Sequence, residues 1–213
     1  NFGDYQDLKP IRSEIESHYL PRLIEMKRVL KQNGSIYLQM DYKISHWLRL
    51  MIDDIGLLFQ NQIVWHYGLG NNNKKRNWQD KSDVILFATK TKDYTWNDMR
   101  GDVTPQMKAK YCHQDEDGFY MMSYGKKYYL KGGKRMGNVF DLPNLSATDG
   151  ERVGYNTQKP KELISRFVLA STNEGDTVAD YYLGSGTTAV VCKELNRNFI
   201  GCDINPKAIE ITN

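Results

Sequence analysis

The chain has 213 residues, 40% of them hydrophobic, and a formal net charge of +3 at pH 7. This length suits one large domain with a sizeable core, and the mild net charge gives by itself no reason to expect a polyanionic partner. No apolar run approaches the ~20 residues of a membrane span and no signal peptide is present, so no membrane partner is expected.

The first half of the chain alternates predicted helices and strands. Apolar residues recur with a helical period over residues 11–30, and a second predicted helix over residues 43–55 is closed by Gly56. Strands are predicted at residues 35–40, 62–67 and 83–88, with a hairpin return at residues 93–96. Helices that alternate with strands favour a doubly wound parallel sheet.

The middle of the chain is basic and rich in tyrosine. From Asn71 to Arg135 there are 14 Lys or Arg residues against 8 Asp or Glu residues. Residues 67–78 predict a polar, mobile loop, and residues 98–145 are the least periodic part of the chain. Cations interleaved with aromatics predict a nucleic-acid surface, and the alternatives are a solvated face or a structural β-insert. The candidate nucleic-acid-binding residues are Lys74, Lys75, Arg76, Lys108, Lys110, Lys126, Lys127, Lys134 and Arg135.

The last third of the chain contains the segment DYYLGSGTT over residues 180–188. The apolar run at residues 177–182 predicts a buried parallel strand, and the G-S-G triplet after it predicts a tight turn. A helix over residues 188–195 and a strand over residues 198–202 are predicted to follow. Residues 177–202 are therefore expected to form a strand, a glycine turn, a helix and a second strand.

Such a unit is suited to a nucleoside-bearing cofactor. Glycines let the backbone approach a ligand, and a helix N-terminus offers free N–H groups to it. Asp203, at the tip of the second strand, is placed to accept hydrogen bonds from ribose hydroxyls. Ala189 stands where a dinucleotide fingerprint would have its third glycine, which disfavours a nicotinamide oxidoreductase. An ordinary glycine turn in an α/β domain is the remaining alternative.

Three helix caps are predicted in this part of the chain. Thr187 and Thr188 are expected to cap the helix after the glycine turn, and Asn205 the last helix. Thr157 is expected to cap a helix that begins near Pro160. These caps would fix where the helices begin relative to the turn.

Cysteines and histidines indicate neither a metal site nor a disulfide framework. The three cysteines and four histidines lack ligand spacing; they are Cys112, Cys192, Cys202, His18, His46, His66 and His113. We therefore expect structural histidines, core positions for Cys192 and Cys202, and a reducing compartment.

The glycine segment, together with RNFIGCDINPKAIEIT after it, resembles the S-adenosylmethionine-binding motifs of the amino-methylating DNA methyltransferases. Upstream, GYNTQKP at residues 154–160 resembles the T-Q-K-P segment that precedes the glycine motif in the β-type order of that family. The resemblance covers most of the chain, and the paired motifs are specific. The family's usual proline and phenylalanine are Tyr181 and Tyr182 here, which implies different packing on the adenine side.

The resemblance implies an α/β fold, a Rossmann-like doubly wound sheet of the S-adenosylmethionine-dependent methyltransferase type with a small target-recognition insert. It divides the chain into a catalytic half at residues 1–97, the insert at 98–150 and a cofactor-binding half at 151–213. The reaction it implies moves a methyl group from S-adenosylmethionine to the N6 amine of an adenine flipped out of DNA. Cytosine N4 methylation and a non-catalytic nucleic-acid-binding subunit with the same fold are the alternatives.

The resemblance also implies roles for single residues. Asp180 and residues 157–159 would lie near the methionine end of the cofactor, and Asp203 would hold the ribose. The implied cofactor-binding residues are Thr157, Gln158, Lys159, Asp180, Tyr182, Gly184, Ser185, Gly186, Thr187, Thr188, Asp203 and Asn205.

The family's catalytic tetrapeptide, Asp/Ser-Pro-Pro-Tyr, is absent from the 213 residues. We expect it immediately before Asn1, so that Asn1 and Phe2 flank it. An Asp at its first position would favour adenine and a Ser cytosine. The expected partners are double-stranded DNA and either a second copy of the chain or a specificity or restriction subunit, in the cytoplasm of a prokaryote or of a phage-infected cell.

Overall fold

The computed structural model describes residues 8–68, 76–155 and 157–212. The chain divides into a larger compact unit, Asn1–Asn97 with Asn138–Asn213, and a smaller one, Asp98–Gly137. Within the described ranges no helix is both long and apolar enough to cross a bilayer. Each unit has its own sheet structure, and the glycine segment belongs to the larger one.

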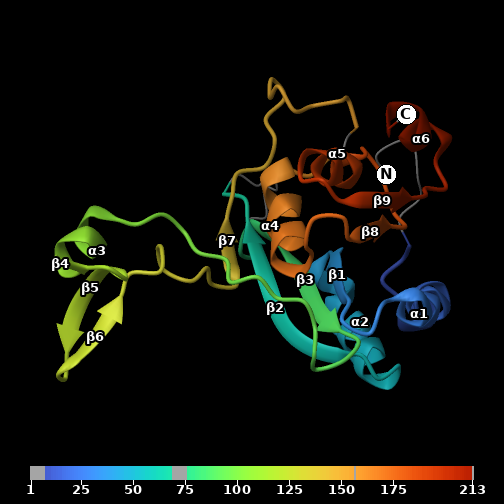
Figure 1. Ribbon diagram of the computed structural model, residues 1–213. Helices are drawn as coiled ribbons and strands as arrows, with labels where there is room; N and C mark the ends of the chain where they lie inside the picture. The colour runs from blue at the N-terminus through green and yellow to red at the C-terminus, as the bar shows by residue number, and fades with distance from the viewer. Residues whose placement is uncertain (1–7, 69–75, 156, 213) are drawn as a thin grey trace. The chain divides into compact units, whose positions relative to one another are not determined.

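The larger unit is built on a four-stranded sheet with the order β1-β3-β2-β7 (Figure 1). The strands are β1 (Ser35–Met40), β2 (Leu58–His66), β3 (Ser82–Thr89) and β7 (Val139–Asp141). β3 is antiparallel to both of its neighbours, whereas β2 and β7 are parallel. The sheet is therefore mixed and not fully parallel as expected. Antiparallel neighbours need no crossover helix, and the described parts of the β2–β3 connection contain none.

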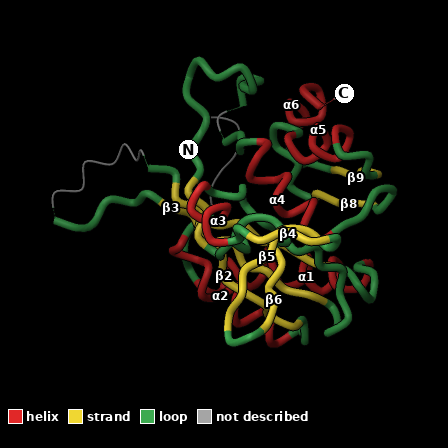
Figure 2. The backbone as a smooth tube through the Cα atoms, turned by 60° about the vertical axis from the view of Figure 1, so that its left-hand side comes forward, coloured by secondary structure: helices red, strands yellow, loops and turns green. Residues whose placement is uncertain are grey.

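Both faces of this sheet are covered because side chains alternate along β3. Leu86 and Ala88 pack in a core cluster with residues of α1 and α2. Ile85 and Phe87 point to the other face and pack in a second cluster with Leu163 of α4. Figure 2 shows the backbone of these elements, with helices in red and strands in yellow. These helices span Arg12–Val29 (α1), Tyr42–Asp54 (α2) and Lys161–Ser171 (α4).

The glycine segment lies on a second, two-stranded parallel sheet. Its strands β8 (Thr177–Asp180) and β9 (Asn198–Gly201) are joined by α5 (Thr187–Glu194), and α6 (Pro206–Thr212) follows β9. Val168 of α4 and Val191 of α5 form a third core cluster, against which Phe199 of β9 packs. α4 therefore contributes to the cores of both sheets.

The turn between β8 and α5 has the predicted glycine geometry but not the predicted caps. Gly184 and Gly186 have φ values of 56° and 76°, in the left-handed region that favours glycine. α5 begins at Thr187 with Gly186 as its N-cap residue and no side-chain cap, so the capping roles expected of Thr187 and Thr188 are wrong. A Cβ on Gly186 would clash with the side chain of Thr212 in α6. The turn thus needs glycine both for its dihedral angle and for space.

The cap expected at Thr157 is also wrong. Pro160 is the N-cap residue of α4 and provides no side-chain hydrogen bond. Instead, Glu151 Oε2 accepts the backbone N–H of Lys161 at 2.9 Å, and a carboxylate at a helix N-terminus is favourable.

Two smaller expectations also differ from the structure. Residues 93–96 form no strand, and the N–H of Thr95 donates to the carbonyl of Asn33 at 3.0 Å instead. Cys192 is buried as predicted, but Cys202 is exposed, as are Ile200 and Gly201 before it, because β9 belongs to a sheet of only two strands.

The smaller unit contains α3 (Pro105–Lys110) and an antiparallel sheet of β4 (His113–Asp115), β5 (Gly118–Ser123) and β6 (Lys126–Tyr129). Tyr120 lies opposite both His113 and Tyr129, so these three rings share one face of the sheet. The unit ends at Gly137, whereas the insert expected from the sequence extends to residue 150. β7 lies in that interval and pairs with β2 of the larger unit.

We predict that Gly186→Ala lowers the free energy of unfolding by roughly 1–2 kcal/mol from the left-handed backbone alone. The clash with Thr212 adds to that loss, so combining the substitution with Thr212→Ala restores only part of it. Chemical denaturation measures both effects. Gly150→Ala is the matched control, because Gly150 has open space around it and no positive φ. Equal midpoints for Gly186→Ala and the wild type would contradict the prediction.

Candidate functional site

Asp203 follows β9, and its carboxylate joins three segments of the chain. Oδ2 accepts the backbone N–H of Gly184 in the turn at 2.8 Å. Oδ1 accepts the backbone N–H of Asn205, just before α6, also at 2.8 Å. Hydrogen bonds to an ionised acceptor are stronger than neutral ones, so this half-buried carboxylate holds the glycine turn, the tip of β9 and the start of α6 together.

Asp180 ends β8 and closes the same turn from its other side. Its Oδ1 accepts the N–H of Tyr182 at 3.0 Å, and its Oδ2 accepts from the hydroxyl of Thr188 at 2.6 Å. Thr188 therefore bonds the strand before the turn and does not cap its own helix. The two carboxylates fix the segment of residues 180–188 between them.

Asn205 combines a confirmed cap with an unsatisfied donor. Its Oδ1 accepts the backbone N–H of Lys207 at 3.0 Å, in the first turn of α6. Its Nδ2 is buried and has no hydrogen-bond partner among the residues that the structure describes. A buried polar group without a partner costs about 1–3 kcal/mol, so this amide is a donor suited to a bound ligand.

Gln158 supports the loop before α4. Its amide oxygen accepts the N–H of Val153 at 2.9 Å, and its amide nitrogen donates to the carbonyl of Glu151 at 2.6 Å. The side chain is buried, and both ends of the amide are engaged by its own loop. These bonds tie Gln158 to Glu151 and Val153.

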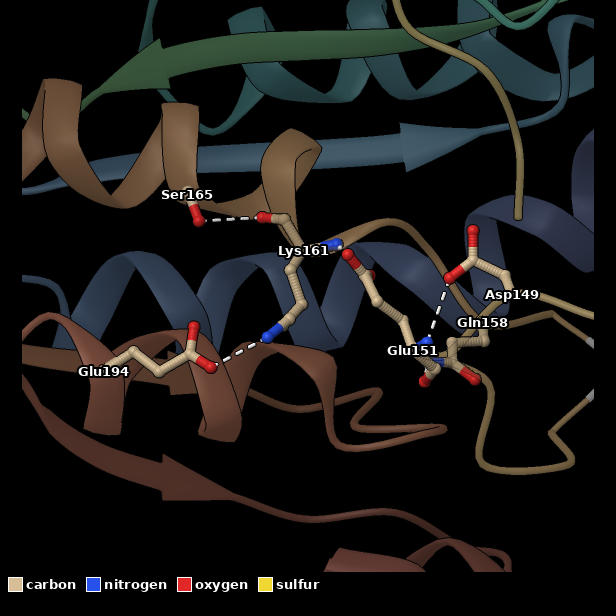
Figure 3. Close-up of polar contacts among 6 residues, drawn as sticks. All are labelled: Asp149, Glu151, Gln158, Lys161, Ser165 and Glu194. Carbon is tan, nitrogen blue, oxygen red and sulfur yellow. Dashed lines mark hydrogen bonds and ion pairs between the residues drawn. The ribbon is translucent and has the colours of Figure 1, made fainter. Parts of the chain in front are cut away.

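A chain of polar contacts continues from this loop to α5 (Figure 3). Asp149 Oδ1 accepts the N–H of Glu151 at 2.9 Å, and the carboxylate of Glu151 meets the start of α4 at Lys161. The ammonium group of Lys161 pairs with Glu194 of α5 at 2.8 Å. The T-Q-K-P region and α5 are therefore held together by side chains that the sequence motifs do not include.

Lys159 contacts both the start of α5 and the four-stranded sheet. Its backbone carbonyl accepts from the hydroxyl of Thr187 at 3.3 Å, and that hydroxyl lies 2.9 Å from the hydroxyl of Ser185. Its ammonium group lies 3.4 Å from Asp83 Oδ2 and 5.1 Å from the ring centroid of Trp65. Asp83 is not among the site residues predicted from the sequence, where it is a single carboxylate near the start of a largely apolar strand.

Two further candidate cofactor residues are Tyr182, within the segment of residues 180–188, and Thr157, before α4. Tyr182 is 49% exposed, and its ring lies 6.3 Å from the ring of Tyr19 in α1. Burial raises the pKa of Tyr182, and the phenol of Tyr19 raises it further. Thr157 is half-buried in the bend before α4. The turn thus has an accessible aromatic ring on one side.

The candidate nucleic-acid-binding residues differ in their surroundings. Lys127 pairs with Asp115 at 2.5 Å and Arg135 with Asp98 at 3.0 Å, and the bond from Lys127 is the main cause of the lowered pKa of Asp115. The exposed cations for which the structure gives no ion pair among its described residues are Arg76, Lys108, Lys110, Lys126 and Lys134. Asn1, Phe2, Lys74 and Lys75 lie outside the described residues.

Residues 3–213 match the N6_N4_Mtase family model, described as DNA methylase. The type II methyltransferase M.HpaI of Haemophilus parainfluenzae is 37% identical over 191 residues, which cover 89% of this chain and 55% of that protein. The DNA adenine methyltransferase YhdJ of Escherichia coli is 32% identical over 190 residues, covering 89% and 62%. The chain therefore spans 55% to 62% of the length of these two relatives.

Solved structures have the same fold. A crystal structure of the M1.HpyAVI–SAM complex is 21% identical, with a TM-score of 0.63 over 91% of this chain and 79% of that one. The cytosine-N4-specific PvuII DNA methyltransferase is 16% identical, with a TM-score of 0.71 over 100% of this chain and 74% of the other. The α/β fold of the methyltransferase type expected from the sequence is confirmed. Because the family model matches almost the whole length of the chain, residues 3–213, the chain belongs to the N6/N4 DNA methylase family.

Proposed function

We propose that the protein is a DNA methyltransferase that transfers a methyl group from S-adenosylmethionine to an exocyclic amine of a base. The observation that carries the proposal is the turn of residues 180–188, which two carboxylates close within a chain of the DNA methylase family. The two relatives described above are named as a type II methyltransferase and a DNA adenine methyltransferase.

The described residues fit S-adenosylmethionine by charge and hydrogen-bonding capacity. The cofactor carries a sulfonium and an ammonium cation, and Asp180 and Asp203 place two carboxylates beside the turn. Each carboxylate oxygen has a second lone pair, so Asp203 can accept from ribose hydroxyls while it keeps its two backbone bonds. Asn205 Nδ2 supplies a buried donor that the protein leaves unused among its described residues. A related structure is titled as a complex with this cofactor.

The cofactor supplies an electrophilic methyl group. The protein's part is to hold the target amine in line with that methyl group and to exclude competing orientations. The exposed ring of Tyr182 offers an apolar face next to the turn, and the two carboxylates keep the turn from shifting when a ligand binds. A base within a duplex cannot reach such a turn, so the target base must leave the stack. The family's tetrapeptide, the expected source of the acceptors for the amine, is not among the 213 residues.

Adenine N6 is the proposed target, and cytosine N4 is the alternative. The relative named as an adenine methyltransferase is 32% identical to this chain, whereas the structure named as cytosine-N4-specific is 16% identical. Double-stranded DNA is the proposed substrate, and the smaller unit is the proposed target-recognition region because of its exposed lysines and tyrosines. A homodimer, a specificity or restriction partner and a cytoplasmic location in a bacterium stay predictions.

The proposal is tested by incubating the protein with DNA and isotope-labelled S-adenosylmethionine, followed by nucleoside analysis. We expect labelled N6-methyladenine. Labelled N4-methylcytosine would replace the adenine assignment and keep the activity. Cofactor binding and DNA binding without any transfer would favour a non-catalytic subunit with this fold.

We predict that Asp203→Ala weakens S-adenosylmethionine binding by at least about tenfold, because it removes two charge-assisted bonds and the proposed ribose acceptor. Titration calorimetry measures this affinity. DNA affinity, measured in the same variant, is the internal control and should change much less. An unchanged cofactor affinity would exclude Asp203 from the cofactor site.

We predict that replacing Lys108, Lys110 and Lys126 together with Gln weakens DNA binding and flattens its salt dependence. Each phosphate contact that is lost lowers the slope of log K against log salt by about one. Replacing Lys127 and Arg135 is the matched comparison, because both are already paired with carboxylates and should contribute less. A slope unchanged in the triple variant would place the DNA surface elsewhere.

A further inference from the structure

Three side chains meet at one edge of the four-stranded sheet. Gln39 lies near the end of β1, and Asp83 near the start of β3. Because these strands are antiparallel, the end of β1 and the start of β3 lie at the same edge. Gln39 Nε2 donates to Asp83 Oδ2 at 2.8 Å, and Lys159 Nζ lies 3.4 Å from the same oxygen. A single carboxylate oxygen therefore connects the sheet to the T-Q-K-P segment.

The position of Lys159 is restricted from a second direction. Its ammonium group lies over the ring of Trp65, which is fully buried and donates its indole N–H to the carbonyl of Leu142 at 2.9 Å. A cation held between a carboxylate and the face of a fixed indole has few alternative positions. The backbone carbonyl of the same residue contacts Thr187, the first residue of α5.

Asp83 is one of three carboxylates near Tyr67, and a second of them, Asp41, pairs with Lys43 at 3.2 Å. Burial raises the pKa of Tyr67, and the carboxylates of Asp83, Asp80 and Asp41 raise it further. Lys159 is the cation that the described contacts place on Asp83. Its loss would leave Asp83 without that positive charge.

We propose that Asp83 is a positioning residue for the cofactor turn, acting through Lys159. By holding the ammonium group, it fixes the backbone of Lys159 against the hydroxyl of Thr187 and thus sets where the start of α5 lies relative to the sheet. This inference rests on the proposed function, because the consequence to be measured is the affinity for S-adenosylmethionine.

The contact is suited to positioning more than to stability. The side chains of Lys159 and Asp83 are 34% and 27% exposed, and ion pairs with this much solvent contribute little to the free energy of unfolding. Asp83→Asn keeps an oxygen that can accept from Gln39 and removes the charge that attracts Lys159. We therefore expect it to leave the melting temperature nearly unchanged and to weaken cofactor binding about fivefold.

A double-mutant cycle tests the route through Lys159. S-adenosylmethionine affinity is measured by calorimetry for the wild type, Asp83→Asn, Lys159→Met and the double variant. If Asp83 acts through Lys159, the double variant binds no more weakly than Lys159→Met alone. The inference would be overturned if the affinity losses of the two single variants multiplied in the double variant, or if Asp83→Asn kept wild-type affinity.

Asp176 provides a matched control, because it precedes β8 and so lies at the end of that strand away from the glycine turn. Asp176 accepts one backbone N–H, from Asn173, and pairs with Lys31 at 3.5 Å, so Asp176→Asn removes a comparable lysine contact away from the turn. This variant should keep wild-type cofactor affinity, and an equal loss in both variants would mean that Asp83 acts only through general stability. Failure of the wild type itself to bind S-adenosylmethionine would refute the proposed function and is distinguishable from both outcomes.

Discussion

The carboxylate of Asp203 is the constraint on which the cofactor-type site depends. The glycine turn and the start of α6 are 19 and 2 residues away from it in sequence, yet both donate a backbone N–H to its two oxygens. A two-stranded sheet has few interactions of its own, so its tips need such side-chain bonds to hold a defined shape. Asp180 accepts two further hydrogen bonds on the other side of the turn, so carboxylates hold the segment from both sides.

α4 transmits this local order to the rest of the larger unit. Leu163 packs with the four-stranded sheet, and Val168 of the same helix packs with α5. One helix therefore belongs to two clusters, and polar contacts at its start, made by Glu151 and Lys161, reinforce the arrangement. The placement of the glycine turn relative to the larger sheet thus depends on ordinary hydrophobic packing supported by a few charged side chains.

Much of the fold could be predicted from hydrophobic periodicity, because long runs such as β3 and the apolar stripe of α2 have one plausible burial pattern. The caps could not. Thr187 and Thr188 have the right residue type for capping, but their hydroxyls bond to the carbonyl of Lys159 and to Asp180, partners that only the tertiary structure provides. The prediction of a fully parallel sheet was also wrong, since β3 is antiparallel to both neighbours. The apolar run of β3 indicates burial on both faces and does not indicate the direction of the strand. Asp83 was missed since nothing local distinguishes a carboxylate that meets a lysine 76 residues later.

The buried amide of Asn205 has a consequence for how the protein responds to its ligand. A donor that is withdrawn from water and has no described acceptor raises the free energy of the empty state. If the proposed cofactor offers an acceptor at this point, it relieves that penalty, and part of its binding free energy then comes from satisfying the Asn205 amide. Binding and thermal stability are then linked, and the temperature at which the chain unfolds rises with the concentration and the affinity of the ligand.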